Sequence, residues 1–188
     1  MRKILISMLA LVTIGMSTLG MTSCDFMNKF VPSKGGVESS VNESENEENN
    51  NDLIYLLSED KMHYSVTDIG SYTATDLVIP SVYQGLPVEK IDAYAFYNCI
   101  RLTSVAIPDG VTRICGLAFS GCSSLKSVVI PKSVTWIGGN AFSWCNRLTS
   151  IRYEGTMAEW AAIGKGDRWN YRMPAKEVIC SDGNVSLK

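Results

Sequence analysis

Cysteines are the residues of this chain that could most readily bind a metal or form covalent bridges, and three of them recur every 23 residues. These three, Cys99, Cys122 and Cys145, lack the paired Cys-x-x-Cys spacing of a zinc site. If each occupies the same place in one of a series of stacked coils, the side chains point in parallel, which disfavours disulfide bonds. We therefore expect buried thiols that pack as small hydrophobic side chains, and no metal site.

The chain has a single histidine, His63, so a metal site built on two or three imidazoles is excluded. A Ser/His or Cys/His mechanism would have to use that one ring, and the sequence pattern places no nucleophile or carboxylate to work with it. The acidic residues are scattered without a matched acid–base pair, and no glycine-rich phosphate loop is present. We predict that the protein is not an enzyme and carries no cofactor; a hydrolase acting through His63 is the minor alternative.

Length and charge limit the remaining function classes. The chain has 188 residues, of which 46% are hydrophobic and 19% charged, so it can form a packed core. Its formal net charge of -2 at pH 7 provides no basic field that would neutralise phosphates. We expect no nucleic-acid partner.

The first 23 residues are typical of an export signal. Two positive charges, Arg2 and Lys3, precede an uncharged, mostly apolar stretch from residue 4 to residue 23. The stretch ends in Met21-Thr22-Ser23-Cys24, which resembles the bacterial lipobox, in which the cysteine is lipidated and becomes the first residue after cleavage. We predict a lipoprotein signal peptide over 1–23 and lipidation at Cys24, which would hold the protein on a membrane facing outside the cytoplasm. An uncleaved membrane anchor and a buried cytosolic helix are the alternatives.

An acidic stretch follows over residues 24–52. From residue 38 onward it contains six acidic residues, no Lys or Arg, and one large apolar residue, Val41. Such a segment cannot bury enough surface to offset the entropy of ordering it, and its like charges repel one another. We predict a disordered tether between the anchor and a folded region, with an acidic interaction tail as the alternative.

The rest of the chain is repetitive. Segments that begin Ala-Phe and end in Cys recur 23 residues apart, at Ala95, Ala118 and Ala141. Each is followed by a leucine and then a short strand, and the strands align as residues 77–79, 105–107, 128–130 and 151–153. The first and third residues of each strand should point into a core, and a proline ends each of the first three. The first unit carries additional residues around 83–87, where a turn is expected.

These observations predict an α+β repeat fold, a short solenoid with 23-residue coils. An N-terminal cap and first repeat would span 53–94, with a β-hairpin formed by residues 54–57 and 64–66. The repeats would continue over 95–153, and a C-terminal cap of helix and strand over 154–188. A capping box at Thr156 and Glu159 should start a helix over 157–163. Trp160, Ile163 and Trp169 could then cover the open end of the last coil, with a final strand at 178–180.

The repeat itself has the pattern Leu-x-x-Val-x-Ile-Pro-x-x-Val-x-x-Ile-x-x-x-Ala-Phe-x-x-Cys, present from Leu102 to Cys122 and from Leu125 to Cys145. It resembles the BspA-like leucine-rich repeats of bacterial surface proteins, and the resemblance extends over roughly residues 53–188. Gly110 and Ser133 stand where leucine-rich repeats commonly carry asparagine or cysteine. The resemblance implies a leucine-rich-repeat solenoid and a role in adhesion or recognition of host proteins.

A binding surface is expected on the outward side of the strands, where Val78, Ala106, Val129 and Arg152 should form a row. Trp136 and Trp144 are further candidates because the repeat leaves their positions variable, although they could instead pack under the C-terminal cap. We predict a membrane-anchored extracytoplasmic lipoprotein that binds an extracellular or envelope protein or glycan, with adhesion as one role. The alternative is a structural envelope component that binds a partner on its own cell.

Overall fold

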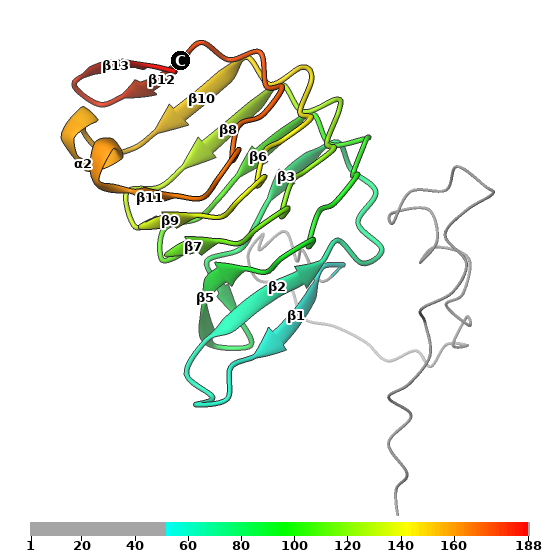
Figure 1. Ribbon diagram of the computed structural model, residues 1–188. Coiled ribbons are helices and arrows are strands. Elements are labelled where there is room, and N and C mark those ends of the chain that lie inside the picture. The colour runs from blue at the N-terminus through cyan, green and yellow to red at the C-terminus, as the bar shows by residue number, and fades with distance from the viewer. Residues whose placement is uncertain (1–51, 188) are drawn as a thin grey trace, which may run out of the picture.

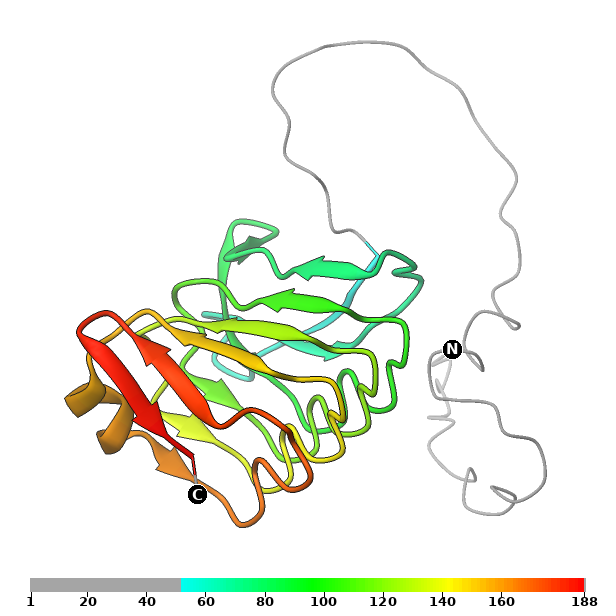
Figure 2. The same cartoon turned by 90° about the horizontal axis from the view of Figure 1, so that it is seen from above.

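The computed structural model describes residues 52–187, which form a solenoid with one mostly parallel sheet along each of two sides (Figure 1). Each central coil contributes one strand to each sheet, as the view from above also shows (Figure 2). The first sheet has six strands in the order β13-β12-β10-β8-β6-β3. Their bounds are β3 Asp76–Val78, β6 Ser104–Ala106, β8 Ser127–Ile130, β10 Ser150–Tyr153, β12 Glu177–Cys180 and β13 Gly183–Ser186.

The second sheet follows the order β1-β2-β5-β7-β9-β11, and β4 pairs with β5 beside this path. Its strands are β1 Ile54–Leu57, β2 Tyr64–Asp68, β4 Val82–Tyr83, β5 Leu86–Ile91, β7 Arg113–Ile114, β9 Trp136–Ile137 and β11 Gly164–Lys165. The antiparallel pair β1 and β2 is the expected N-terminal hairpin, and it closes the array by pairing β2 with β5. The expected turn around residues 83–87 is the tight connection between β4 and β5.

The repeat period determines the register of both sheets. Leu77 pairs with Val105, Val105 with Val128, and Val128 with Ile151, so equivalent repeat positions lie side by side. The inward residues of these strands are at most 3% exposed, whereas the outward residues are half-buried or exposed. The predicted strand alignment, the alternation of faces and the solenoid are therefore confirmed.

Aromatic rings form the centre of the core. Phe96, Phe119 and Phe142 are fully buried and stack face to face, with ring centroids 5.0 and 5.2 Å apart and planes within 6° of parallel. Trp169 ends this stack edge-on to Phe142, at 6.4 Å, and contacts Trp160 at 5.8 Å. The prediction that these two tryptophans cover the last coil is confirmed.

The repeat cysteines lie beside the phenylalanine stack, and all three are buried. The thiols of Cys122 and Cys145 each donate a hydrogen bond to the main-chain oxygen of the phenylalanine one coil earlier, at 3.1 Å. Burial raises the pKa of Cys145 to about 12. The expectation of buried thiols that pack as small side chains is confirmed.

The Ala-Phe segments are turns rather than helices. Leu117 and Gly121 bracket one of them with φ angles of 61° and 78°, in the left-handed region that no α-helix contains. Among residues 52–187 the structure has one α-helix, α2 (Met157–Ala162), so the predicted α+β repeat fold contains little helix. This helix starts at the predicted capping box: the Thr156 hydroxyl accepts from the Glu159 main-chain N–H, and the Glu159 carboxylate accepts from the Thr156 N–H.

Hydroxyl side chains tie neighbouring coils together where leucine-rich repeats commonly carry asparagine. The Gly110 N–H donates to the Ser133 hydroxyl at 3.2 Å, and that hydroxyl donates to the Val111 main-chain oxygen at 2.8 Å. Two positions after Ser133, the hydroxyl of Thr135 donates to the main-chain oxygen of Thr112. Serine and threonine thus replace the amide ladder in holding the coils in register.

Part of the predicted organisation falls outside the described residues. The signal peptide over 1–23, the lipidation site Cys24 and all of the 24–52 tether except Asp52 lie there. Within residues 52–187, no helix is long and apolar enough to cross a membrane.

Candidate functional site: the strand face

The outward side of the six-stranded sheet forms an extended, regular surface. We call it the strand face and define it by Val78, Ala106, Val129, Arg152 and Ile179, which the strand register places in one row. Val78 is 56% exposed and Ile179 44% exposed, so both ends of the row present apolar side chains. The four predicted strand residues are thus brought together.

Two strands beyond the predicted four widen this face. The prediction included a strand at 178–180 but did not place Ile179 in the row, although strand alternation points that residue outward when its two neighbours are buried. The strand β13, which pairs antiparallel with β12, was not predicted. Six strands at about 4.8 Å spacing give a face about 24 Å wide, broader than four strands would give.

A polar margin runs beside this row. Ser104, Ser127 and Ser150 are paired along it by the strand register. At its first strand, the Asp76 carboxylate accepts hydrogen bonds from the hydroxyls of Ser104 at 2.6 Å and Thr103 at 3.0 Å. These bonds hold the pKa of Asp76 below its usual range, so this end of the margin carries a negative charge at neutral pH.

The strand face has a hollow at its C-terminal end. Its lining consists of Arg152, Tyr153, Glu154, Ile179, Cys180 and Ser181. The Arg152 guanidinium and the Glu154 carboxylate bring opposite charges to its border, beside the exposed apolar side chain of Ile179. These side chains can form hydrogen bonds with polar groups of a partner and pack against its apolar groups, but they contain no nucleophile–base pair.

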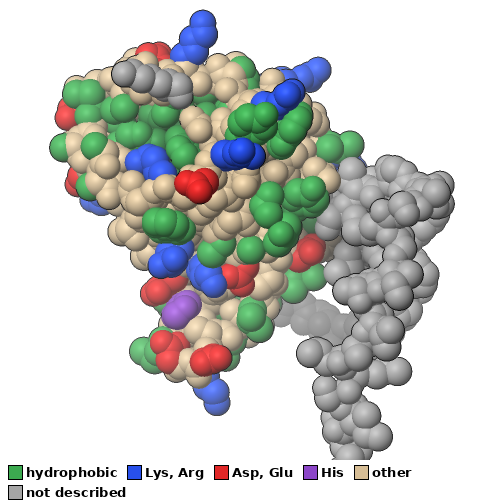
Figure 3. All heavy atoms as spheres, viewed as in Figure 1, with side chains coloured by type: hydrophobic (Ala, Val, Ile, Leu, Met, Phe, Trp, Pro, Cys, Tyr) green, Lys and Arg blue, Asp and Glu red, His purple; other side chains and the backbone are tan. Residues whose placement is uncertain are grey.

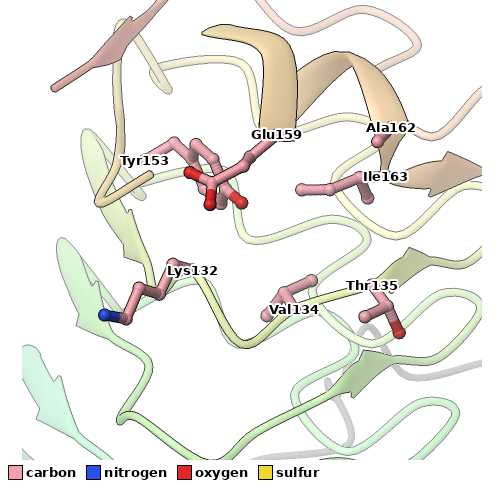
Figure 4. A pocket seen from close by; sticks show the side chains of 7 residues that line it. All are labelled: Lys132, Val134, Thr135, Tyr153, Glu159, Ala162 and Ile163. Atoms are coloured by element: carbon pink, nitrogen blue, oxygen red, sulfur yellow. The ribbon is translucent and has the colours of Figure 1, made fainter. Parts of the chain in front are cut away.

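A smaller pocket of about 200 Å³ lies between α2 and the last coil (Figure 4). Lys132 lies across it from Tyr153 and Glu159, and Val134 and Ile163 are among the residues that line it. Ligand pockets commonly measure about 300–1,000 Å³, so this one is small. The Glu159 carboxylate already serves the capping box, and burial, followed by the nearby Glu159 charge, raises the pKa of Tyr153. We interpret the pocket as the seam left where α2 joins the array.

Comparison with known proteins identifies the repeat type. Residues 89–162 match the family described as "BspA type Leucine rich repeat region (6 copies)". This part of the chain is therefore similar to BspA-type leucine-rich repeats. No curated protein matches the chain.

Solved structures of leucine-rich repeat proteins from bacteria share this fold. The protein from Bacteroides capillosus superposes with a TM-score of 0.56 and 26% identity, over 69% of this chain and 94% of that one. The protein from Bacteroides ovatus gives a TM-score of 0.55 and 25% identity, over 69% of this chain but only 36% of that one. The leucine-rich repeat protein of T. pallidum, at 24% identity and a TM-score of 0.52, covers 68% of each chain and supports the fold alone.

The two predicted tryptophans do not belong to the strand face. Trp136 lies in β9 of the other sheet, where its ring covers Gly164: a Cβ added to that glycine would lie 2.4 Å from the ring. Trp144 lies in a turn beside Tyr171. Both pack against residues of the C-terminal cap, as the alternative expected, but they remain 38% and 46% exposed. The buried tryptophans of the cap are Trp160 and Trp169.

His63 lies in the N-terminal cap, between Asp60 and Glu89, whose carboxylates are 3.8 and 3.7 Å from its Nδ1. The Ser58 hydroxyl donates to Asp60 and accepts from the His63 main-chain N–H, so it is not directed at the imidazole ring. Across the described part of the chain, no three His, Cys, Asp or Glu side chains gather as a metal site.

Proposed function

We propose that this protein is a membrane-anchored extracytoplasmic lipoprotein whose BspA-type repeats bind a protein or a glycan through the strand face. The observation that carries the proposal is the row of outward side chains, which the repeat register aligns across the sheet with exposed Val78 and Ile179 at its ends. Solenoid proteins commonly bind through such extended surfaces. The family match over residues 89–162 supports a binding role.

The shape of the face favours a macromolecular partner. A small substrate is usually enclosed by a pocket, whereas the strand face is an open sheet surface with a hollow only at one end. A face about 24 Å wide offers a limited contact area and hence modest affinity for one copy. Many copies on one membrane would strengthen attachment through avidity.

The anchor is proposed from Met21-Thr22-Ser23-Cys24 and the charged and apolar residues that precede it. Lipidation is tested by growing cells that express the full chain in medium that contains labelled palmitate. We expect label on the wild-type protein and none on Cys24→Ser, with Cys115→Ser as the labelled control. Label retained by Cys24→Ser would refute lipidation at this residue.

The binding role is tested by immobilising the full chain and offering host extracellular-matrix proteins and, separately, envelope extract of the producing cell. Val78→Glu and Ile179→Glu should weaken saturable capture, because each places a charge on an exposed apolar position of the face. Leu56→Glu is the matched control, since Leu56 is 60% exposed on the other sheet.

The source of the captured partner decides between two roles. Capture of a host component supports adhesion, whereas capture only from the cell's own envelope supports a structural envelope role. Capture that Leu56→Glu and Val78→Glu weaken equally would refute the assignment to the strand face.

A further inference from the structure

The turn that carries Trp144 differs from the equivalent turns of the preceding coils. Asn98, Gly121 and Trp144 occupy the same repeat position and have φ angles of 56°, 78° and 62°. Asparagine and glycine adopt this left-handed conformation readily, whereas a bulky side chain is rarely found in it. Since Trp144 is 46% exposed, core packing does not explain a tryptophan there. Strained residues cluster at functional sites, so this position is a candidate for one.

Trp144 is the centre of an exposed group that we call the Trp144 cluster, formed with Arg168, Tyr171 and Arg172. The Arg172 guanidinium lies 4.4 Å from the centre of the Trp144 ring. The Tyr171 ring stands edge-on to Trp144 at 5.9 Å, and the Arg168 guanidinium lies 5.7 Å from the Tyr171 ring. In Figure 3, hydrophobic and basic side chains gather together at the upper right of the molecule, along the edge that carries the turns.

Main-chain bonds between the last two coils hold this cluster in place. The Trp144 N–H donates to the Tyr171 oxygen at 2.9 Å, and the Tyr171 N–H donates to the Arg168 oxygen at 3.0 Å. The buried Ser143 hydroxyl also donates to the Arg168 oxygen, at 2.7 Å. The aromatic rings and guanidiniums are thus carried by a backbone that needs little reorganisation to bind a ligand.

No ion pair offsets the positive charge of the Trp144 cluster within the described part of the chain. No carboxylate there lies within ion-pair distance of Arg168 or Arg172. The hydrogen bond and the charge of Arg172, with a smaller effect from Arg168, lower the pKa of Tyr171, as expected in a positive field. The cluster therefore combines exposed aromatic faces with two guanidiniums available to an external anion.

We propose that the Trp144 cluster is a binding site for an acidic polysaccharide, separate from the strand face. The flat C–H side of a sugar ring packs on an exposed indole or phenol ring, and a guanidinium matches a sugar carboxylate with two parallel hydrogen bonds. An extended peptide that gains affinity by adding a strand needs open main-chain groups. Here the main-chain N–H groups of Phe142 and Trp144 are already bonded to the next coil.

The test measures binding of the full chain to three polymers: polygalacturonate, its fully methyl-esterified form, and polyglutamate. We expect polygalacturonate to bind with an affinity that falls as salt is added. The esterified form should bind at least about tenfold more weakly, because it keeps the sugar ring but loses the negative charge. Polyglutamate should also bind more weakly, because it keeps the charge and loses the ring.

Variants then locate the site. Trp144→Asn introduces the residue found at the equivalent Asn98, so it should fold at least as well as the wild type and bind polygalacturonate about tenfold more weakly. Arg172→Ala should lose a similar factor. Trp136→Ala removes an exposed tryptophan that also lies near an arginine, 5.9 Å from Arg113, and should leave binding unchanged.

Several results would overturn the proposal: no binding of polygalacturonate, equal affinity for the esterified polymer, or undiminished binding by Trp144→Asn. Polyglutamate binding at least as tightly would assign the site to an acidic peptide instead. If Val78→Glu abolishes polygalacturonate binding while Trp144→Asn does not, the glycan binds the strand face. The Trp144 cluster proposal would then fail while the proposed function stood.

Discussion

The stacked phenylalanines predict a graded loss of stability along the solenoid. Phe119 stacks on two rings, Phe96 and Phe142, whereas Phe96 has one ring neighbour in the stack, and both are fully buried. An aromatic pair contributes about 0.5–1.5 kcal/mol beyond the area that it buries. Leucine keeps an apolar side chain in place, so Phe119→Leu should cost about 1 kcal/mol more than Phe96→Leu.

Equilibrium unfolding in urea measures this difference, because the buried Trp160 and Trp169 should change fluorescence as the core opens. The double variant with both leucines supplies a second readout. The sum of the single costs counts the ring pair of Phe96 and Phe119 twice, so the double variant should cost about 1 kcal/mol less than that sum. Equal costs for the two single variants, together with additive costs in the double variant, would refute the view that ring stacking couples the coils.

Three further predictions concern single positions. Gly138→Ala should destabilise the chain strongly, because the new Cβ would lie 2.3 Å from the Gly116 main-chain nitrogen; Gly116→Ala, with 3.3 Å of clearance, is the milder control, and similar melting temperatures would contradict this. Thr156→Ala should cost about 1 kcal/mol by removing the helix cap. The hydrogen bonds from Thr156 lower the pKa of Glu159 below its usual 4.5, so their contribution to the stability of the fold should be present above pH 4.5. That contribution should fade as the pH falls through the lowered pKa. A difference in the free energy of unfolding between wild type and Thr156→Ala that stays constant at acidic pH would contradict this. Cys145, whose pKa is raised to about 12 by burial, should resist iodoacetamide at pH 8 in the folded chain and react in urea; mass spectrometry that finds rapid labelling of the folded chain would show the core to be open.

Most of the fold could be predicted because it depends on short-range patterns repeated in register. The alternation of Val128, Val129 and Ile130 predicts which side of the strand is buried, and the capping box at Thr156 predicts where α2 begins. The segment around Phe119 is a turn bracketed by left-handed residues, because the solenoid needs a tight corner there. Propensity does not predict that corner at Leu117, because leucine favours helix and gains its conformation from bonds to the next coil.

The candidate binding sites were harder to predict from the sequence than the fold was. The row from Val78 to Arg152 could be identified because it follows the repeat, but its continuation to Ile179 required pairing across the C-terminal cap. Trp136 and Trp144 occupy different parts of the coil, a strand and a turn, so their exposed rings lie in different places. The sequence prediction grouped them only because both occupy variable positions of the repeat.

The amino-acid sequence by itself determined the coil, its period and its register, because identical side chains recurring at a fixed interval can share one core only when equivalent positions stack. Only the tertiary structure decided which side chains contact one another outside the repeat. The last coil is lengthened by α2, so no constant interval relates Arg172 to Trp144, and only the folded chain places the guanidinium over the ring. A repeat specifies neighbours through periodicity, whereas contacts across an irregular cap depend on the path of the folded backbone.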